Sequence, residues 1–344
     1  MSKKVLVVKL GTAIISDRAG NIDKKIIRKV AAEIAALSGR YQVVLVSSGA
    51  VGSGKKFIPR YKGTLSERKA AAAIGNPILI QLYHHYFSQY GITVAQALCE
   101  RVHFSNRPQF LQLKETFATL WANNIVPVVN ENDLVSNIEI KFSDNDELAT
   151  LLAVGFDASG LLLCTSAGGL LDDHKKIIPL VPKVDASVMK YVDSSTSGSG
   201  LGGMLSKLTF TRLATSMGIP VAICALKGDT PLQDALAKNN GTWFDAKPSN
   251  LRNRQKWLAS GSQTIGSLQV DKGAYKALLA RKSLLTVGIQ AVTGKFIAGE
   301  VVQLKDEEDK LLGVAKTKLD NTQIESQLNN RNVIAAHADD IVLF

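Results

Sequence analysis

Short apolar runs alternate with longer amphipathic segments along the first 250 residues. The apolar runs are rich in β-branched residues and predict strands buried on both faces, at 5–8, 43–46, 93–98, 125–129, 161–164 and 221–224. The amphipathic segments predict helices at 24–37, 67–90 with a break at 75–77, 108–123, 146–154 and 205–217. This alternation predicts an α/β fold, a three-layer αβα sandwich around a mostly parallel sheet.

The pattern changes after residue 250. Residues 251–256 are polar and basic, and residues 260–262 are typical of a linker. The apolar runs that follow are short and separated by glycines, which predicts strands at 268–270, 288–292, 300–304 and 341–343, a helix at 273–280 and an acidic turn at 306–309. We therefore expect a large domain over 1–250, a linker over 251–265 and a small β-rich barrel over 266–344.

Composition excludes several classes of protein. Of the 344 residues 46% are hydrophobic and 21% are charged, as in globular proteins, and no apolar run approaches the ~20 residues that span a bilayer. Lys9 and Gly11 interrupt the apolar N-terminal run, so we expect no signal peptide. Cys99, Cys164 and Cys224 lie far apart, which predicts buried thiols in a reducing compartment, with neither a disulfide framework nor a structural zinc site. We expect a cytoplasmic protein without membrane contact.

Positive charge is concentrated in the first third of the chain. The net charge is +11, and residues 1–100 carry 15 Lys and Arg against 5 Asp and Glu. This excess favours an anionic substrate or an acidic surface, and a solvated basic face is the alternative. The chain has no Arg-rich tract and no basic stripe interleaved with aromatics, which weakens the case for nucleic acid.

Polar segments follow the predicted strands, at the edge of the sheet where such folds bind ligands. Lys9 closes the first strand, where a buried ammonium requires an anion, and Gly11 lets backbone amides approach the same anion. A lysine that reaches solvent is the alternative. The segment 130–133 follows the strand at 125–129 and suits a polar zwitterion, or else forms a polar turn.

The predicted helix at 146–154 begins with a cluster of polar residues. Asn145 can face a ligand and Asp146 can hold a lysine ammonium there. Alternatively, Ser143 and Asp146 form a capping box with a purely structural role.

A glycine-rich loop precedes the predicted helix at 205–217. Its glycines, in the segment 197–203, leave backbone amides free to hold phosphates, and the helix dipole adds to this attraction. Lys207 stands in the first turn of the helix, a placement that the alternative of a flexible linker does not predict.

The segment from Gly49 to Lys55 imitates a phosphate-binding loop. It matches most of the pattern GxxxxGK[ST], but Lys56 replaces the hydroxyl that would hold Mg²⁺. We expect instead a turn that passes close to a small ligand, with Ser47 or Ser48 offering a hydroxyl.

Five segments together resemble the amino acid kinase family, in the branch that phosphorylates glutamate. They are 7–12 (VVKLGT), 46–50 (VSSGA), 128–133 (VVNEND), 144–146 (DND) and 200–207 (GLGGMLSK). The segment from residue 266 resembles the PUA domain that many bacterial members of this branch carry. The resemblance implies transfer of the γ-phosphoryl group of Mg²⁺-bound ATP to the γ-carboxylate of L-glutamate, the first step towards proline.

The resemblance also implies roles for individual residues. Lys9 and Lys207 would hold the moving phosphoryl group, and Asp146 would organise both lysines. Glutamate would be bound by Ser48, Asp133 and Asn145. The nucleotide would be bound by Lys9, Thr165, Ser166, Leu201, Gly202, Gly203, Met204, Leu205, Ser206 and Lys207. No metal site on the protein itself is implied, since Mg²⁺ comes with the nucleotide. Proline is implied as a feedback inhibitor, and the large apolar helix faces favour self-association into a homo-oligomer.

Elementary chemistry agrees with a carboxylate acceptor. Free Glu titrates near pH ~4.3, so the acceptor is already ionised at pH 7 and needs no general base. The site must instead bring two anions together, which requires positive charge and backbone donors. Two lysines and a glycine-rich helix start meet that requirement.

Three positions depart from the pattern of the family. Ser166 stands where members commonly carry an acidic residue and Leu171 where they carry an aromatic one, which brings ATP affinity or base preference into question. Asn76 stands where relatives carry Gln.

Two alternatives to a glutamate kinase stay open. One is another acid kinase of the family, acting on aspartate, acetylglutamate or a nucleotide. The other is an RNA-binding or regulatory protein that uses the PUA-like domain, although residues 251–344 carry only 13 Lys and Arg against 10 Asp and Glu.

Overall fold

The computed structural model describes residues 3–17, 21–135, 144–191, 203–246, 255, 264–328, 330 and 332–343. The chain divides into two compact units, residues 1–103 with 108–249 and residues 250–344 with 104–107. Most of the expected linker at 251–265 lies outside the described residues, so its extent stays a prediction. No helix in the described part of the chain is long and apolar enough to cross a bilayer.

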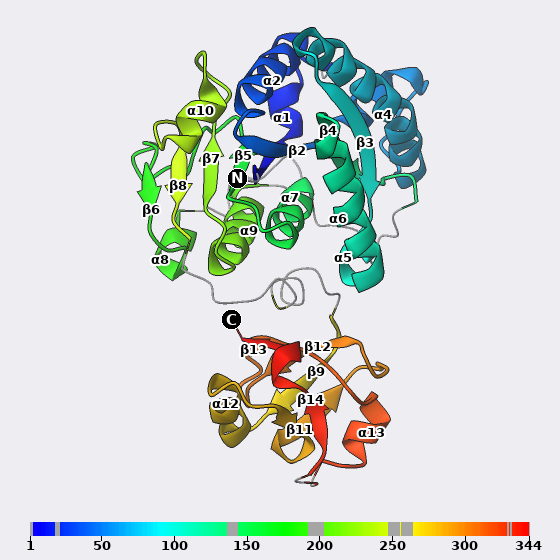
Figure 1. The fold of residues 1–344 in the computed structure, drawn as a ribbon, viewed down its shortest axis with the longest axis vertical. Coiled ribbons are helices and arrows are strands. Elements are labelled where there is room, and N and C mark those ends of the chain that lie inside the picture. The colour runs from blue at the N-terminus through cyan, green and yellow to red at the C-terminus, as the bar shows by residue number, and fades with distance from the viewer. Residues whose placement is uncertain are drawn as a thin grey trace. The chain divides into compact units, whose positions relative to one another are not determined.

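The first unit is built on one eight-stranded sheet with the order β3-β4-β2-β1-β5-β7-β8-β6 (Figure 1). Its strands are β1 (Lys4–Leu10), β2 (Tyr41–Ser47), β3 (Thr93–Cys99), β4 (Ile125–Glu131), β5 (Gly160–Cys164), β6 (Leu180–Val181), β7 (Val221–Cys224) and β8 (Thr242–Phe244). Strands β3 through β7 in this order run parallel, while β8 is antiparallel to β7 and parallel to β6. The mostly parallel sheet expected from the sequence is confirmed.

Helices cover both faces of this sheet. They are α1 (Thr12–Ile15), α2 (Lys24–Leu37), α3 (Ala50–Gly54), α4 (Leu65–Phe87), α5 (Val102–Ser105), α6 (Arg107–Ala122), α7 (Asn145–Gly155), α8 (Ala186–Met189), α9 (Met204–Ser216) and α10 (Pro231–Leu236), with short 3₁₀ turns η1 (Lys55–Phe57) and η2 (Ser88–Tyr90). Leu6, Val8 and Leu10 alternate along β1 and share one apolar core with residues of α2 and α4. Helices α7 and α9 pack on the opposite face (Figure 1).

Helix α4 contradicts the break expected at 75–77. It runs unbroken from Leu65 to Phe87 with Pro77 inside it. The helix tolerates Pro77 because α3 packs tightly against the neighbouring Gly75. A Cβ at Gly75 would lie 1.8 Å from the carbonyl oxygen of Ala50. The helix–helix contact outweighs the one ladder hydrogen bond that Pro77 cannot donate.

Strand β3 contradicts the expectation of burial on both faces. It lies at the edge of the sheet, where Thr93, Gln96 and Leu98 are exposed. Its apolar composition resembles that of the central strands, but only β4 pairs with it.

The second unit contains a five-stranded sheet with the order β11-β9-β12-β13-β15 and a two-stranded sheet of β10 and β14. Its elements are β9 (Thr264–Val270), α12 (Lys272–Leu279), β10 (Leu284–Leu285), η3 (Thr286–Gly288), β11 (Ile289–Thr293), β12 (Val301–Lys305), β13 (Leu311–Lys316), α13 (Asn321–Glu325), β14 (Ile334–Ala336), η4 (Ala338–Asp340) and β15 (Ile341–Leu343). Leu268, Val302 and Leu304 lie at the centre of its own apolar core. The β-rich architecture is confirmed, although β10, β13, β14 and α13 were not expected.

Candidate active site

Three charged residues from distant parts of the chain meet on one carboxylate. Lys9 is the next-to-last residue of β1, Asp146 lies in the first turn of α7, and Lys207 lies in the first turn of α9. The Nζ atom of Lys9 is 2.6 Å from Oδ1 of Asp146, and Nζ of Lys207 is 2.9 Å from Oδ2. The exposed fractions are 0% for Asp146, 5% for Lys9 and 6% for Lys207. The predicted convergence of the two ammonium groups is therefore present.

The cluster concentrates two positive charges in one buried place. Two ammonium groups converge on one carboxylate in a place that excludes most water, and the carboxylate of Asp144 lies close enough to Lys9 and Asp146 for their charges to interact. Two buried ammonium groups held side by side attract an anion that enters the site. The arrangement is suited to binding and neutralising a negatively charged group.

Asp144 joins the two helices that carry Asp146 and Lys207. Its Oδ1 caps α7 by accepting hydrogen bonds from the backbone N–H groups of Asp146 (2.8 Å) and Glu147 (3.1 Å). Its Oδ2 accepts a hydrogen bond from the hydroxyl of Ser206 in α9. Burial and the neighbouring charge of Asp146 raise the pKa of Asp144. The helix cap is thus Asp144, while Ser143 of the alternative capping box lies outside the described residues.

A second carboxylate beside the cluster is neutralised separately. Glu147 is buried and forms an ion pair with Arg101. Glu147 therefore pairs with Arg101, whereas the neighbouring Asp146 pairs with the two lysines.

Two of the residues expected to bind glutamate lie in contact. The Nδ2 atom of Asn145 donates to the hydroxyl of Ser48 (2.9 Å) and to Oδ1 of Asn130 (3.0 Å). Asp133, the third expected residue, lies in the turn two residues beyond β4, on the same edge of the sheet. All of these residues follow the carboxyl ends of strands or begin the next helix, where parallel sheets bind their ligands.

The residues expected to bind the nucleotide are described in part. Thr165 and Ser166 directly follow β5, and the backbone N–H of Thr165 donates to Cys224 in the neighbouring strand β7 (2.8 Å). Gly203 is the N-cap of α9, so Met204, Leu205 and Ser206 form its first turn. The hydroxyl of Ser206 is occupied by Asp144. Leu201 and Gly202 lie outside the described residues.

Comparison with known protein families identifies the two domains of the chain. The sequence profile of the amino acid kinase family matches residues 4–225, and that of the PUA domain matches residues 266–334. The chain belongs to the amino acid kinase family.

Similar proteins cover nearly the whole chain. A glutamate 5-kinase from Aquifex aeolicus is 37% identical and aligns with 98% of this chain and 99% of its own length. Glutamate 5-kinases from Citrobacter koseri and Shewanella oneidensis are 34% and 36% identical, and cover 98% and 91% of this chain and 98% and 87% of their own lengths.

Solved structures share the fold of the large unit. A carbamate kinase from Giardia aligns with 72% of this chain and 100% of its own, at 17% identity and a TM-score of 0.52. The carbamate kinase from Giardia lamblia bound to AMP-PNP gives a TM-score of 0.51 at 19% identity, over 72% of this chain and 99% of its own. At such identities the likeness establishes an amino acid kinase fold.

The phosphate-loop imitation at Gly49–Lys55 has a packing role. A Cβ on Gly54 would lie 1.9 Å from the carbonyl oxygen of Ala71, so this glycine lets α3 approach α4. Lys55 and Lys56 are exposed on the 3₁₀ turn that follows. The sequence predicts a turn close to a small ligand at this segment, whereas residues 50–54 form helix α3 and Gly54 serves helix packing.

Sequence reasoning missed the supporting residues of the site. The sequence pattern indicates no role for Asp144, although it lies in the segment 144–146, and none for Arg101. Both act by pairing with residues far along the chain, which a pattern of neighbours cannot reveal.

Proposed function

We propose that this chain transfers the γ-phosphoryl group of ATP to the γ-carboxylate of L-glutamate and so forms L-glutamyl 5-phosphate, the first step of proline biosynthesis. The observation that carries the proposal is the pair of buried ammonium groups, Lys9 and Lys207, on the two oxygens of Asp146. The near full-length likeness to glutamate 5-kinases supports the choice of acceptor.

The chemistry needs charge rather than a base. A γ-carboxylate oxygen attacks the γ-phosphorus, a new P–O bond forms, and the bond to the β,γ-bridging oxygen breaks to release ADP. The acceptor is ionised at neutral pH, so no proton has to be removed from it. Lys9 and Lys207 neutralise the transferring group, and Asp146 keeps both ammonium groups in place before the substrates arrive.

The remaining residues bind the two substrates in this proposal. Ser48, Asp133 and Asn145 bind glutamate, with polar groups for its amino and carboxylate ends. The nucleotide lies against Thr165, Ser166 and the loop and first turn of α9 (201–207), and brings Mg²⁺ with it. The N-terminus of α9 supplies backbone N–H groups and a favourable dipole for phosphate oxygens.

A coupled ADP-release assay with L-glutamate and Mg·ATP tests the proposal, with hydroxylamine trapping of the acyl phosphate as a second readout. We expect turnover that depends on both substrates. L-Aspartate, N-acetyl-L-glutamate and UMP serve as competing acceptors in the same assay. A higher kcat/KM for one of them would transfer the assignment to another acid kinase, and absence of turnover with every acceptor in folded protein would refute it.

We also propose that proline inhibits the enzyme and that the chain self-associates in the cytoplasm. Support for self-association is the outer edge of β3, which no other strand covers among the described residues and where Leu98 is 37% exposed. Steady-state inhibition by L-proline and light scattering after gel filtration test the two statements. Salt-dependent RNA binding that is lost on deletion of residues 266–344 would instead favour a role of the PUA domain in RNA recognition.

A further inference from the structure

A row of side-chain amides leads from helix α4 to the proposed glutamate site. Asn76 lies within α4, Asn130 near the end of β4, and Asn145 at the start of α7. The Nδ2 atom of Asn130 donates to Oδ1 of Asn76 (3.2 Å), and the Nδ2 atom of Asn145 donates to Oδ1 of Asn130 (3.0 Å). We propose that Asn76 is a positioning residue, which fixes the orientation of Asn130 and thereby the amide of Asn145 that faces glutamate. This inference rests on the proposed function.

The hydrogen bonds of Asn130 allow one orientation of its amide. Its Oδ1 accepts from the backbone N–H of Glu131 (2.9 Å) as well as from Asn145. A rotated amide would turn its NH₂ group towards both of these donors, so the N–H of Glu131 and the NH₂ group of Asn130 would lose their acceptors, while Asn145 would keep the hydroxyl of Ser48. The Oδ1 atom of Asn76 accepts a hydrogen bond from the NH₂ group of Asn130, and this bond favours the same orientation of the Asn130 amide.

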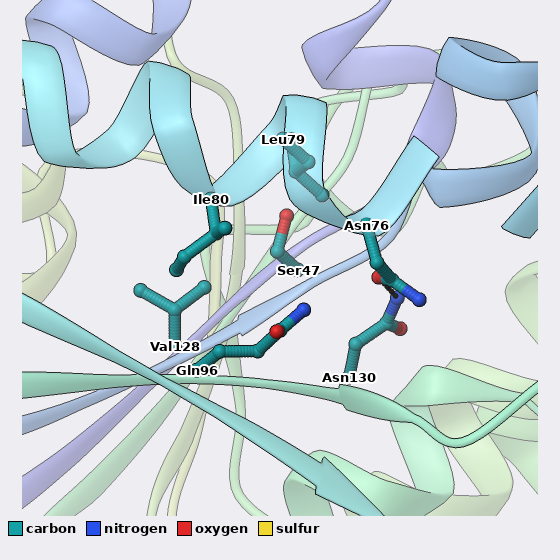
Figure 2. A pocket seen from close by; sticks show the side chains of 7 residues that line it. All are labelled: Ser47, Asn76, Leu79, Ile80, Gln96, Val128 and Asn130. Carbon is teal, nitrogen blue, oxygen red and sulfur yellow. Dashed lines mark hydrogen bonds between the residues drawn. The ribbon is translucent and has the colours of Figure 1, made fainter. Parts of the chain in front are cut away.

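The two amides lie beside a small cavity. Asn76 and Asn130 border this cavity of about 10 Å³, whose other walls include the apolar side chains of Leu79, Ile80 and Val128 (Figure 2). Figure 2 shows Asn76 reaching from the helix and Asn130 from the strand, with their amides meeting at the rim. Apolar side chains line the rest of this cavity, so the hydrogen bond from Asn130 to Asn76 is the polar contact that joins helix α4 to this amide row.

Asn76 itself is well placed to serve as a fixed point. It is 8% exposed and Asn130 is 6% exposed, so water competes little for their hydrogen bond. The preceding residue, Gly75, presses the backbone of α4 against α3. The backbone at Asn76 therefore cannot shift without breaking that contact.

The test compares Asn76→Leu, which keeps the size of the side chain and removes the acceptor, with Asn76→Gln, which keeps an amide oxygen on a side chain that is one methylene longer. Ile80→Val is the control, since it changes the same cavity and no hydrogen bond. We expect Asn76→Leu to raise KM for glutamate about tenfold, the effect of one buried donor left without an acceptor, with kcat and KM for ATP within about twofold of wild type. Asn76→Gln and Ile80→Val should keep the wild-type KM.

A double-mutant cycle separates positioning from general damage to the fold. In an Asn130→Ala background, Asn76→Leu should add no further increase in KM, because the residue through which it acts is gone. Four results would each overturn the inference if the wild-type protein phosphorylates glutamate. They are an unchanged KM for glutamate in Asn76→Leu, an equal rise of this KM in Ile80→Val, an equal rise in Asn76→Gln, and full additivity of the effects on KM in the double-mutant cycle. Wild-type protein without glutamate turnover would overturn the proposed function and this inference with it.

Discussion

Lys9 and Lys207 bind opposite oxygens of the same carboxylate, although one lies near the end of the central strand β1 and the other in the first turn of helix α9. Asp146 is therefore shared: it is the partner of both ammonium groups, and each lysine fixes one of its oxygens. The distance between the two ammonium groups is set by this carboxylate before any substrate binds. Such preorganisation is what electrostatic catalysis of phosphoryl transfer requires.

Replacing Asp146 by Asn keeps its shape and removes its charge. The two buried lysines would then lose the carboxylate that binds both of them, so we expect the free energy of unfolding to fall by about 3–5 kcal/mol. We expect kcat to fall by at least about 100-fold, because the ammonium groups lose their fixed positions. Urea denaturation and the ADP-release assay measure the two effects. Wild-type stability in Asp146→Asn would show that the carboxylate does not compensate the lysines.

Removing either lysine should affect turnover more than folding. Lys9→Ala and Lys207→Ala should each lower kcat by about 10²–10³-fold, the usual effect of losing one preorganised contact to the transferring group. Lys55→Ala is the matched control, since Lys55 ends the phosphate-loop imitation and is exposed. A similar loss of kcat in Lys55→Ala would revive the loop as the phosphate site.

Gly75→Ala should destabilise the large unit strongly. The added Cβ would lie 1.8 Å from the carbonyl oxygen of Ala50, a backbone atom that cannot give way without moving α3. We expect a loss of at least about 3 kcal/mol in the free energy of unfolding, as for overpacked cores. Gly39→Ala adds the same methyl group where nothing lies within 4 Å and should stay within about 0.5 kcal/mol of wild type. Equal effects of the two substitutions in urea denaturation would contradict the close packing of α3 on α4.

The course of the large sheet was predictable because its strands are continuous apolar runs. Helix α2 has the bounds expected from the spacing of its apolar positions, and β1, β2 and β5 follow from theirs. The exposure of β3 was not predictable, since a strand's place in the sheet depends on partners far away in the sequence. Strands β6 and β8 have too few residues for their sequences to show the alternation of a strand. The residues Gly75 and Pro77 predict a break in α4, but the packing of α4 against α3 keeps the helix continuous.

The charged part of the candidate site was predictable from residue type and position. A lysine at the inner end of a buried strand needs an anion, and an aspartate at a helix start can supply it. The hydrogen bonds of Asp144 to Ser206 and of Asn130 to Asn76 were not predictable. They join elements whose relative placement depends on the packing of the whole unit: α7 and α9 in the first case, β4 and α4 in the second.

Buried thiols should make the protein less stable at alkaline pH. Burial raises the pKa of Cys99 to about 12, and the neighbouring Cys224 together with burial raises the pKa of Cys164. Unfolded thiols titrate near pH ~8.5, so above that pH the unfolded chain binds fewer protons than the folded one and stability falls as pH rises. For Cys99 alone the slope is about 1.4 kcal/mol per pH unit.

Denaturation at pH 8 and pH 10 checks this expectation, with Cys99→Ala as the control. The variant should lose less stability between the two values than the wild type does. An identical pH dependence would show that Cys99 ionises as readily in the folded protein as in the unfolded chain.

Thr211→Val should stabilise the protein. The hydroxyl of Thr211 in α9 is fully buried and has no hydrogen-bond partner among the described residues. Valine has the same shape and no polar group to desolvate, so we expect a gain of about 1 kcal/mol in the free energy of unfolding. Thermal and urea denaturation measure the change, and a loss of stability would show that the hydroxyl has a partner.

The central position of β1 affects how the nascent protein can fold. One neighbour, β2, is synthesised soon after β1, whereas the other, β5, ends at residue 164. The ammonium of Lys9 meets Asp146 only after translation has reached that region, and Lys207 emerges from the ribosome later still. During synthesis the first half of the sheet therefore exposes an unpaired apolar edge at β1, and this edge is the surface that a chaperone or an aggregating partner would meet.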